Sequence, residues 1–244
     1  MTRGKRADVL LVERGLFDSR TRAQAAIAAG LVTADGVPLR KASDELAADA
    51  ALETRPDYPW VSRGGLKLAA ALDCFGFDPA GRFCLDVGAS TGGFTDVLLA
   101  RGAQRVYAVD VGRGQLHRRL RDNPAVVSLE ETDIRALDPA RLAEPSDFVT
   151  IDVSFISLKL MLPTLDRLIR RPVHLIALIK PQFEAGRAHL KKGIVREPKI
   201  HSAVCDEISS LVASLSWTVA GIVPSPIQGG EGNREFLLGA HRPA

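Results

Sequence analysis

Short apolar runs alternate with amphipathic stretches along the chain after residue 60. Continuous apolar runs are typical of strands in a sheet that is covered on both faces. The expected strands are Phe83–Val87, Arg105–Val111, Val126–Leu129, Phe148–Val153, Val173–Ile179, Trp217–Val223 and Glu235–Ala240. The expected helices are Ser62–Leu72, Gly92–Arg101, Gln115–Arg121, Ile156–Ile169 and Ile200–Leu215, with a long loop over Pro181–Pro198. This alternation predicts a doubly wound α/β sheet.

The first 56 residues have a different pattern. Apolar residues at helical spacing predict one helix over Arg6–Gly15 and a second over Arg20–Ala29, which Asp18 or Ser19 caps. Leu31–Pro38 has the pattern of a hairpin with an Asp-Gly turn. Prolines at positions 56 and 59 then interrupt regular structure. We therefore predict a small α+β domain over 1–56, a linker over 57–61 and a larger α/β domain over 62–244.

The segment that follows the first strand of the larger domain is built mainly from small residues, Gly88-Ala-Ser-Thr-Gly-Gly-Phe94. Glycines let a ligand approach bare backbone, and the helix that follows presents unpaired N–H groups. Such a loop at the end of a first parallel strand is where doubly wound folds bind nucleotides. Ser90 departs from the strict G-x-G-x-x-G pattern, and no phosphate-binding P-loop motif occurs. The alternative is a tight turn without a ligand.

Acidic residues recur at the ends of predicted strands: Asp86, Asp110, Asp133 and Asp152. These ends share one edge of a parallel sheet, where ligands bind. Asp110 lies about 20 residues after the loop, the spacing of a carboxylate that binds a ribose. We expect Asp133 to accept from an adenine amine, and Asp86 either to hold the loop or to face a cationic part of the ligand. One acid here would be an ordinary helix cap, but a series of four indicates a site.

Three further charged residues stand out. Lys180 ends an apolar strand, and apolar surroundings favour the neutral amine that acts as a general base. Glu235 opens the last strand after a glycine-rich turn. Lys67 lies in the first turn of its helix, where the helix dipole disfavours a cation. The alternatives are a surface lysine at 67, a lysine at 180 whose ammonium reaches solvent, and a glutamate at 235 that protects an edge strand.

Composition indicates a globular protein with a slight basic excess. The net charge is +3, and the contents of 46% hydrophobic and 25% charged residues are ordinary. Arginines concentrate in the first 22 residues, which is compatible with binding nucleic acid. Neither the three cysteines nor the histidines have metal-site spacing, so we expect no metal and a reducing, cytoplasmic location. No signal sequence or membrane-length apolar run occurs, and we expect no membrane partner.

The small domain resembles the S4-type RNA-binding module that is found in a ribosomal protein and in several RNA-modifying enzymes. The matching residues are Arg6, Asp8, Leu10, Leu11, Gly15, Ser19, Arg20, Ala23, Ile27, Gly30, Val32 and Gly36. The alternative is a helical cap whose arginines are simply solvated.

The larger domain carries six ordered motifs, at 62–68, 86–96, 151–158, 178–184, 193–196 and 232–237. Together with the small domain, they resemble the TlyA family of S-adenosylmethionine-dependent ribosomal RNA methyltransferases. This family is related to the FtsJ-type 2′-O-methyltransferases, and some members carry the name hemolysin. The resemblance covers essentially the whole chain. One departure is the linker, since Arg55–Val61 is longer than the usual Arg-x-Trp-Val of the family.

The resemblance implies a Rossmann-like class I methyltransferase sheet and 2′-O-methylation of a ribose, which we expect to be that of a cytidine in 16S or 23S ribosomal RNA or both. It also implies a catalytic tetrad, Lys67, Asp152, Lys180 and Glu235. We assign Lys180 as the base. In this hypothesis Asp152 holds Lys180 and Lys67, and Glu235 orients Lys67.

Cofactor and RNA contacts are assigned on the same basis. The residues expected to bind S-adenosylmethionine are Asp86, Gly88, Ala89, Ser90, Thr91, Gly92, Gly93, Phe94, Asp110, Val111, Asp133 and Asp152. Those expected to contact RNA are Arg3, Arg6, Arg20 and Arg22 in the small domain and Arg63, Arg187, Lys191 and Lys192 in the larger one. We expect a monomer or a weak dimer. The alternatives are a membrane-active, hemolysin-like protein and an RNA-binding protein with an inactive methyltransferase domain. Calorimetry with S-adenosylmethionine separates them, since absent binding favours either alternative.

Overall fold

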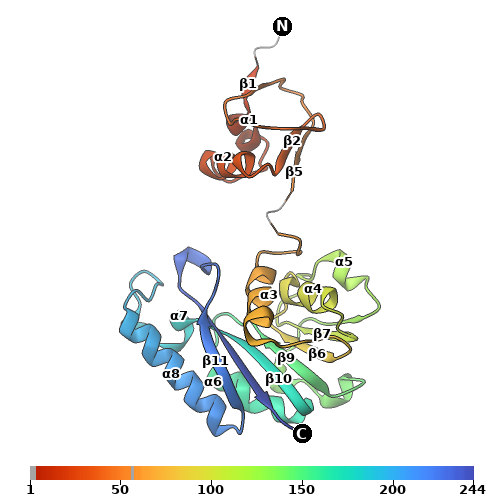
Figure 1. Ribbon diagram of the computed structural model, residues 1–244, viewed down its shortest axis with the longest axis vertical. Coiled ribbons are helices and arrows are strands. Elements are labelled where there is room, and N and C mark those ends of the chain that lie inside the picture. The colour runs from red at the N-terminus through yellow and green to blue at the C-terminus, as the bar shows by residue number, and fades with distance from the viewer. Residues whose placement is uncertain (1–3, 56–57) are drawn as a thin grey trace. The chain divides into compact units, whose positions relative to one another are not determined.

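The computed structural model describes residues 4–55 and 58–244, which form two compact units, Met1–Pro59 and Trp60–Ala244 (Figure 1). The boundary between the units falls within the predicted linker. Trp60 belongs to the second unit, because its ring occupies the space that a side chain at Gly65 would need. Each unit has its own hydrophobic core.

The N-terminal unit consists of two helices and short antiparallel strands. The helices are α1 (Ala7–Glu13) and α2 (Arg20–Ala28), and the strands are β1 (Lys5–Arg6), β2 (Val32–Ala34), β3 (Val37–Pro38), β4 (Glu45–Leu46) and β5 (Leu52–Thr54). Strands β3, β2 and β5 form one sheet in that order, and β1 pairs with β4. The structure confirms both predicted helices and the hairpin.

Local sequence explains these elements. The Ser19 hydroxyl accepts from the Arg22 N–H at the start of α2. Asp35 and Gly36 have φ values of 50° and 78°, the positive values that a tight two-residue hairpin turn requires. Apolar side chains from both helices and from β2 fill a small core: Ala7, Leu11, Ala23, Ile27 and Val32.

The second unit is built around a seven-stranded sheet with the order β11-β12-β10-β9-β6-β7-β8. The strands are β6 (Phe83–Val87), β7 (Arg105–Val109), β8 (Val126–Leu129), β9 (Ser146–Ile151), β10 (Ile169–Ile179), β11 (Thr218–Pro224) and β12 (Phe236–Arg242). Strands β10, β9, β6, β7 and β8 are parallel, and β12 runs antiparallel to both of its neighbours. The α/β fold class is therefore confirmed. Because β12 lies inside the sheet, Glu235 does not protect an edge strand.

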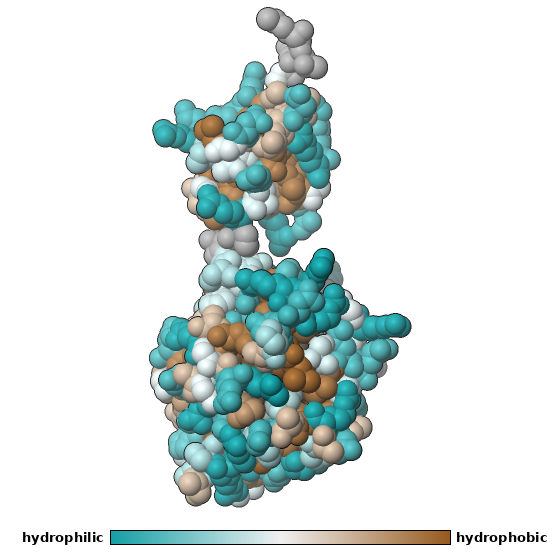
Figure 2. All heavy atoms as spheres, turned by 90° about the vertical axis from the view of Figure 1, so that its right-hand side faces the viewer, coloured by the Kyte–Doolittle hydropathy of each residue, from teal (hydrophilic) through white to brown (hydrophobic). Residues whose placement is uncertain are grey.

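Both faces of this sheet are covered. Successive strand residues alternate between two apolar clusters, with Cys84 and Ile176 in one and Leu85 and Leu175 in the other. The first cluster includes residues of α3 (Gly64–Phe75) and α4 (Gly93–Ala100), and the second includes residues of α6 (Leu158–Met161) and α8 (Pro198–Ser214). On the face that Figure 2 shows, hydrophilic side chains are interspersed with hydrophobic ones.

Three predicted segments differ from the structure. The helix expected over Ile156–Ile169 is a single turn, α6, followed by the 3₁₀ helix η3 (Leu162–Arg167), because Pro163 lacks the N–H that would continue an α-helix. The helix expected over Gln115–Arg121 is reduced to α5 (Arg118–Arg121). The loop expected over Pro181–Pro198 contains α7 (Pro181–Glu184) and η4 (Arg187–His189).

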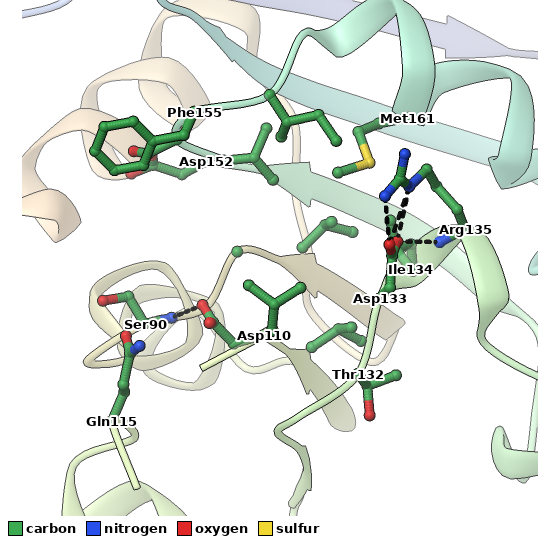
Figure 3. A pocket seen from close by; sticks show the side chains of 17 residues that line it. Ser90, Asp110, Gln115, Thr132, Asp133, Ile134, Arg135, Asp152, Phe155 and Met161 are labelled. Atoms are coloured by element: carbon green, nitrogen blue, oxygen red, sulfur yellow. Dashed lines mark hydrogen bonds and ion pairs between the residues drawn. The ribbon is translucent and has the colours of Figure 1, made fainter. Parts of the chain in front are cut away.

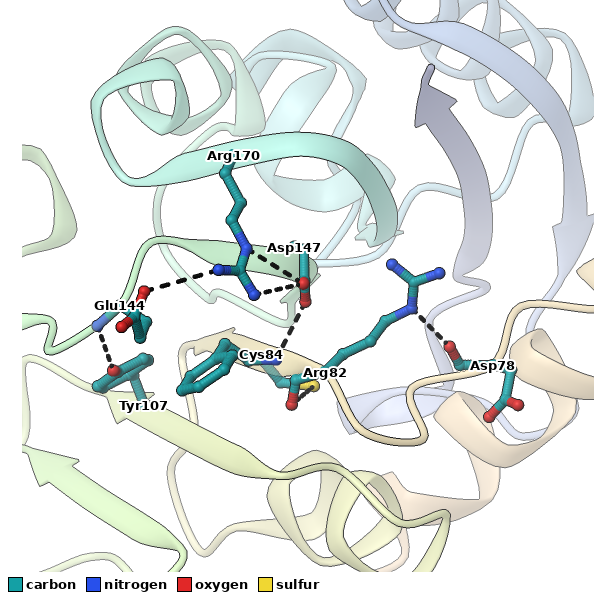
Figure 4. Close-up of polar contacts among 8 residues, drawn as sticks. Asp78, Arg82, Cys84, Tyr107, Glu144, Asp147 and Arg170 are labelled. Atoms are coloured by element: carbon teal, nitrogen blue, oxygen red, sulfur yellow. Dashed lines mark hydrogen bonds and ion pairs between the residues drawn. The ribbon is translucent and has the colours of Figure 1, made fainter. Parts of the chain in front are cut away.

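The ends of the strands opposite the predicted site are joined by a polar network (Figure 4). Asp147 Oδ1 accepts from the Phe83 N–H at 3.0 Å, and Asp147 Oδ2 accepts from Arg170 Nη2 at 3.0 Å. Arg170 also lies 3.6 Å from a carboxylate oxygen of Glu144. One carboxylate therefore links β6, β9 and β10.

We predict that Asp147→Ala lowers the free energy of unfolding by about 1–3 kcal/mol, because a partly buried N–H and a guanidinium both lose their acceptor. Urea denaturation measures this loss. The matched control is Asp73→Ala, which removes the exposed Asp73–Arg101 pair and should change stability by less than about 1 kcal/mol. Equal effects of the two substitutions would refute the role of Asp147.

Candidate active site

The small-residue loop after β6 is packed too closely for ordinary side chains. Gly88 has a φ of +81°, and a Cβ at this position would lie 2.5 Å from the Asp152 carbonyl oxygen. Gly92 has a φ of +98°, and a Cβ there would collide with Leu120. Ser90 also has a positive φ, of 47°. The loop therefore presents backbone rather than side chains to the edge of the sheet.

Asp110, at the end of β7, holds this loop (Figure 3). Its Oδ2 accepts from the Ser90 N–H at 2.8 Å, and its Oδ1 accepts from the Gly112 N–H at 2.7 Å. Each carboxylate oxygen keeps a further lone pair. The carboxylate therefore organises two loops and can still accept from a ligand.

A cavity of about 450 Å³ opens beside these loops (Figure 3). It is lined by Val87, Gly88, Ser90, Val109, Asp110, Val111, Gln115, Thr132, Asp133, Ile134, Arg135, Asp152, Val153, Ser154, Phe155, Ile156 and Met161. Apolar side chains, Phe155 and Met161 among them, alternate here with polar and charged ones, a mixture that suits a small organic ligand with polar groups. Val111 is 72% exposed, so its side chain is available to a ligand.

Asp133 lines this cavity, but its carboxylate is already engaged. Both of its oxygens accept from the Arg135 guanidinium, the shortest contact being 2.6 Å from Nη2. The same guanidinium holds the pKa of Asp133 below its ordinary value. Asp133 is therefore ionised at neutral pH. A ligand that donates to this carboxylate would share its oxygens with the Arg135 guanidinium.

Glu130 has a structural role that the sequence did not reveal. Its carboxylate accepts from the backbone N–H groups of Gly114, Gln115 and Leu116 at 2.6–3.0 Å. Hydrogen bonds from the backbone, that of Leu116 first, lower the pKa of Glu130. The carboxylate holds the segment after β7 in a loop, which explains why the predicted helix begins only at Arg118. Its position directly after β8 was the only sequence signal.

Asp86 lies beneath the loop and lines none of the cavities described here. It is fully buried, and it accepts from the hydroxyls of Thr95 at 2.6 Å and Thr150 at 2.9 Å. Burial raises the pKa of Asp86 to about 6. Of the two predicted roles, these contacts fit the one that holds the loop, because Thr95 lies on α4 and Thr150 on β9.

Two more cavities adjoin the first. One, of about 180 Å³, is lined by Ser62, Gly64, Gly88, Ala89, Ser90, Thr91, Gly93, Phe94, Asp152, Ser154 and Lys180. The other, of about 450 Å³, is lined by Arg63, Lys67, Ser154, Phe155, Lys180, Gln182, Phe183, Gly193, Gly229, Gly230, Asn233 and Glu235. Ser154 lines all three cavities and Lys180 lines these two. Lys180 therefore lies where the second cavity, of about 180 Å³, meets the third.

The four residues of the predicted tetrad form two ion pairs. Lys67 Nζ lies 2.5 Å from Glu235 Oε2, with side chains 9% and 3% exposed. Lys180 Nζ lies 2.6 Å from Asp152 Oδ1, and it donates to Ser154 Oγ at 2.8 Å. Within the described residues, no hydrogen bond or ion pair joins Lys67 to Asp152, so the expectation that Asp152 holds both lysines differs from the structure.

Several residues of the third cavity were not predicted individually. Phe155 is 90% exposed and has a φ of 65°, which a bulky residue rarely adopts. Its ring centroid lies 5.1 Å from that of Phe183 on α7. Ser154, Gln182 and Asn233 also line the cavity. These residues lie inside or beside the predicted motifs, but local patterns do not show which side chains face the cavity.

The predicted RNA-binding residues of the small domain are mostly paired with acids. Arg6 and Arg20 both bind Asp8, and Arg22 pairs with Asp18. Arg3 lies outside the described residues.

In the larger domain, Arg63 is exposed and lines the third cavity. Lys191 and Lys192 are exposed in the loop that precedes α8, and Arg187 lies in η4. No cluster of three or more potential metal ligands occurs within residues 4–55 and 58–244. Over the same residues, no helix combines the length and apolar character needed to cross a membrane.

The sheet order, the loop after β6 and the acids along its edge define a Rossmann-like methyltransferase domain that follows a small RNA-binding-type domain. Family comparisons agree, since the FtsJ-like methyltransferase profile matches residues 60–242 and the S4 domain profile matches residues 5–51. The chain belongs to the FtsJ-like methyltransferase family and carries an S4 domain at its N-terminal side.

Similar proteins extend over nearly the whole chain. The Mycobacterium tuberculosis protein named 16S/23S rRNA (cytidine-2′-O)-methyltransferase TlyA is 43% identical over 98% of this chain and 90% of its own length. Hemolysin A of Brachyspira hyodysenteriae is 36% identical over 95% of this chain and 98% of its own length. A solved structure from Streptococcus thermophilus, provisionally named a hemolysin, is 41% identical. It has a TM-score of 0.77 and covers 100% of this chain and 90% of its own.

We predict that Asp86→Asn removes a pH dependence of stability. The folded-state pKa of about 6 lies above the ordinary 3.8, so the folded protein binds more protons than the unfolded chain between about pH 4 and pH 6. Through Asp86, the free energy of unfolding of the wild type should therefore fall as the pH rises from about 4 to about 6, by at most about 3 kcal/mol. Urea midpoints at pH 4.5 and pH 7.5 test this for both proteins, with exposed Asp73→Asn as the control. Parallel pH profiles for wild type and Asp86→Asn would contradict it.

Proposed function

We propose that this protein transfers a methyl group from S-adenosylmethionine to the 2′-hydroxyl of a cytidine in ribosomal RNA. The observation that carries the proposal is the position of Lys180. Its ammonium is paired with Asp152 and lies where the second cavity meets the third. A base between a cofactor cavity and a nucleoside cavity is what proton removal and methyl transfer to one oxygen require.

The residues around the first two cavities fit S-adenosylmethionine. Asp110 would accept from the ribose hydroxyls, and Val111, Ile134 and Met161 supply an apolar lining for the adenine. The close approach at Gly88 leaves bare backbone beside the cofactor, and Thr91 and Gly93 line the second cavity, where the amino-acid part would lie. When bound, S-adenosylmethionine supplies an electrophilic methyl group.

The chain's own residues prepare the nucleophile. A ribose hydroxyl is a weak nucleophile until its proton is removed. Lys180 gives up its own proton to solvent before the reaction, and its amine then accepts the proton of the hydroxyl. Asp152 and Ser154 hold the Lys180 nitrogen in place, and Asp152 stabilises the ammonium that forms. Glu235 fixes Lys67 in the wall of the third cavity, where its positive charge favours the oxyanion as it develops.

The third cavity suits a nucleotide taken out of its stack. Phe155 is exposed beside Phe183, so an aromatic ring is available for stacking on a base. Arg63 adds a cation to the same cavity, and the exposed Arg6 and Arg20 of the S4 domain supply further cations for the RNA backbone. Ribosomal RNA as substrate also implies a cytoplasmic site of action.

The choice of cytidine and of 16S or 23S RNA rests on the printed activity of the Mycobacterium tuberculosis relative, which is similar over nearly its whole length. An inactive methyltransferase domain is disfavoured, because all four tetrad positions are filled and paired. The hemolysin name of another relative has no counterpart among the features of the site described above.

We predict that Lys180→Ala lowers the rate of RNA methylation at least about a hundredfold, because the general base is lost. Transfer of labelled methyl groups to unmodified ribosomal RNA measures the rate, and calorimetry checks that cofactor binding persists. The control is Lys159→Ala, which removes a lysine paired with Glu207 outside the cavities and should leave the rate unchanged. Near-normal turnover by Lys180→Ala with intact cofactor binding would overturn the assignment.

We predict that Glu130→Gln weakens S-adenosylmethionine binding about tenfold, because three backbone N–H groups lose a charged acceptor and the loop that carries Val111 and Gln115 loosens. Calorimetric dissociation constants measure the effect. Glu131→Gln is the matched control, since the Glu131 side chain is exposed and forms just a long, exposed ion pair of 3.9 Å with Arg113 among the described residues. Similar dissociation constants for both variants would argue against this function of Glu130.

A further inference from the structure

A fully buried carboxylate in the S4 domain pairs with two arginines. Asp8 is in the first turn of α1, and its side chain is 0% exposed. A buried carboxylate is costly unless charged or polar donors surround it. Its donors are Arg6, Arg20 and Gln24, which come from the start of α1 and from α2. Hydrogen bonding by Arg6, first of several causes, holds the pKa of Asp8 well below its ordinary value, so the carboxylate is ionised at neutral pH.

Both arginines bind Asp8 through the same edge of the guanidinium. Arg6 donates from Nε at 3.0 Å and from Nη2 at 3.2 Å. Arg20 donates from Nε at 3.3 Å and from Nη2 at 2.9 Å. A guanidinium has five N–H groups in one plane, so this binding mode uses one edge and leaves the outer edge with Nη1. Within the part of the chain that the structure describes, neither Nη1 group donates a hydrogen bond.

The two arginine side chains are exposed and together keep a positive charge. The side chains of Arg6 and Arg20 are 47% and 56% exposed, while Asp8 is completely covered. Two guanidiniums and one carboxylate leave a net charge of +1. A planar outer edge with paired N–H groups matches the oxygens of a phosphate. Because Asp8 already fixes both arginines, they lose less conformational freedom when they bind a ligand.

Arg22 provides the contrast within the same helix. It pairs with Asp18 four residues earlier, and the two side chains are 64% and 86% exposed. An exposed pair of this kind fixes its members weakly. Asp18 and Asp8 thus carry the same charge beside arginines of the same domain, and only Asp8 fixes the orientation of its partners.

We propose that Asp8 is a positioning residue for RNA binding, which holds Arg6 and Arg20 so that their outer edges face the phosphates of the RNA backbone. The inference rests on the proposed function, because RNA is the ligand. It predicts an effect opposite to that of charge alone. Removal of the Asp8 carboxylate makes the domain more positive, which by itself would tighten RNA binding, yet the loss of fixed arginines weakens it.

The test compares full-length wild type, Asp8→Asn and Asp18→Asn for binding to unmodified 16S and 23S ribosomal RNA transcripts at 50, 100 and 200 mM salt. We expect Asp8→Asn to raise the dissociation constant about tenfold and to raise KM for RNA with little change in kcat. Asp18→Asn, with the same change in charge, should bind as tightly as wild type or more tightly. Equal or tighter binding by Asp8→Asn, with an unchanged melting temperature, would refute the inference.

A second pair of variants covers the case in which Asp8→Asn does not fold. Arg20→Lys keeps the positive charge, but an ammonium has no planar edges with which to bind Asp8 and a phosphate at the same time. This variant should therefore also weaken RNA binding about tenfold. Arg40→Lys, at an exposed arginine of the same domain, should have no comparable effect. Equal affinities of these two variants would overturn the role of Asp8 while leaving the proposed function intact. A wild-type protein that binds neither transcript would instead overturn the proposed function itself.

Discussion

The site depends on a buried ion pair between two distant parts of the chain. Lys67 on α3 and Glu235 before β12 are 168 positions apart, and their charged atoms lie 2.5 Å from one another in a nearly solvent-free setting. Removing either partner would leave an uncompensated buried charge, which costs several kcal/mol. The pair therefore fixes α3 against the start of β12 and forms part of the wall of the third cavity. The conformation of the turn before β12 serves the same end, because a side chain at Gly229 would overlap the Glu235 carboxylate.

The other acidic residues and Lys180 differ in their exposure and in the role of their charge. Lys180 and Asp152 form a second pair beside the cavities, where a substrate can reach the amine. Asp110 and Glu130 use their carboxylates to hold backbone N–H groups, and they thereby shape the loops of the first cavity. Asp86 is fully buried, and its carboxylate accepts hydrogen bonds from two threonine hydroxyls instead of pairing with a cation. The same residue type thus serves as an ion-pair partner, as a loop anchor and as a packed core residue.

Local pattern predicted much of the fold, because its causes are local. Apolar runs located the strands, and Pro163 would also have predicted the break between α6 and η3. The antiparallel direction of β12 depends on how the chain returns to the sheet, and no local pattern records that. The site shows the same division. The unfavourable position of Lys67 in its helix was visible, but its partner followed only from the family resemblance. Glu130 and Phe155 were not predicted, because their roles depend on where folding places them.

Mass spectrometry can identify the atom that this protein methylates. Purified protein is incubated with trideuteromethyl-labelled S-adenosylmethionine and ribosomal RNA from cells that lack the gene, and the RNA is then digested to nucleosides for mass spectrometry. We expect deuterium in 2′-O-methylcytidine and in no base-methylated nucleoside. Label on a base, or no transfer to RNA under conditions in which the protein binds the cofactor, would contradict this expectation.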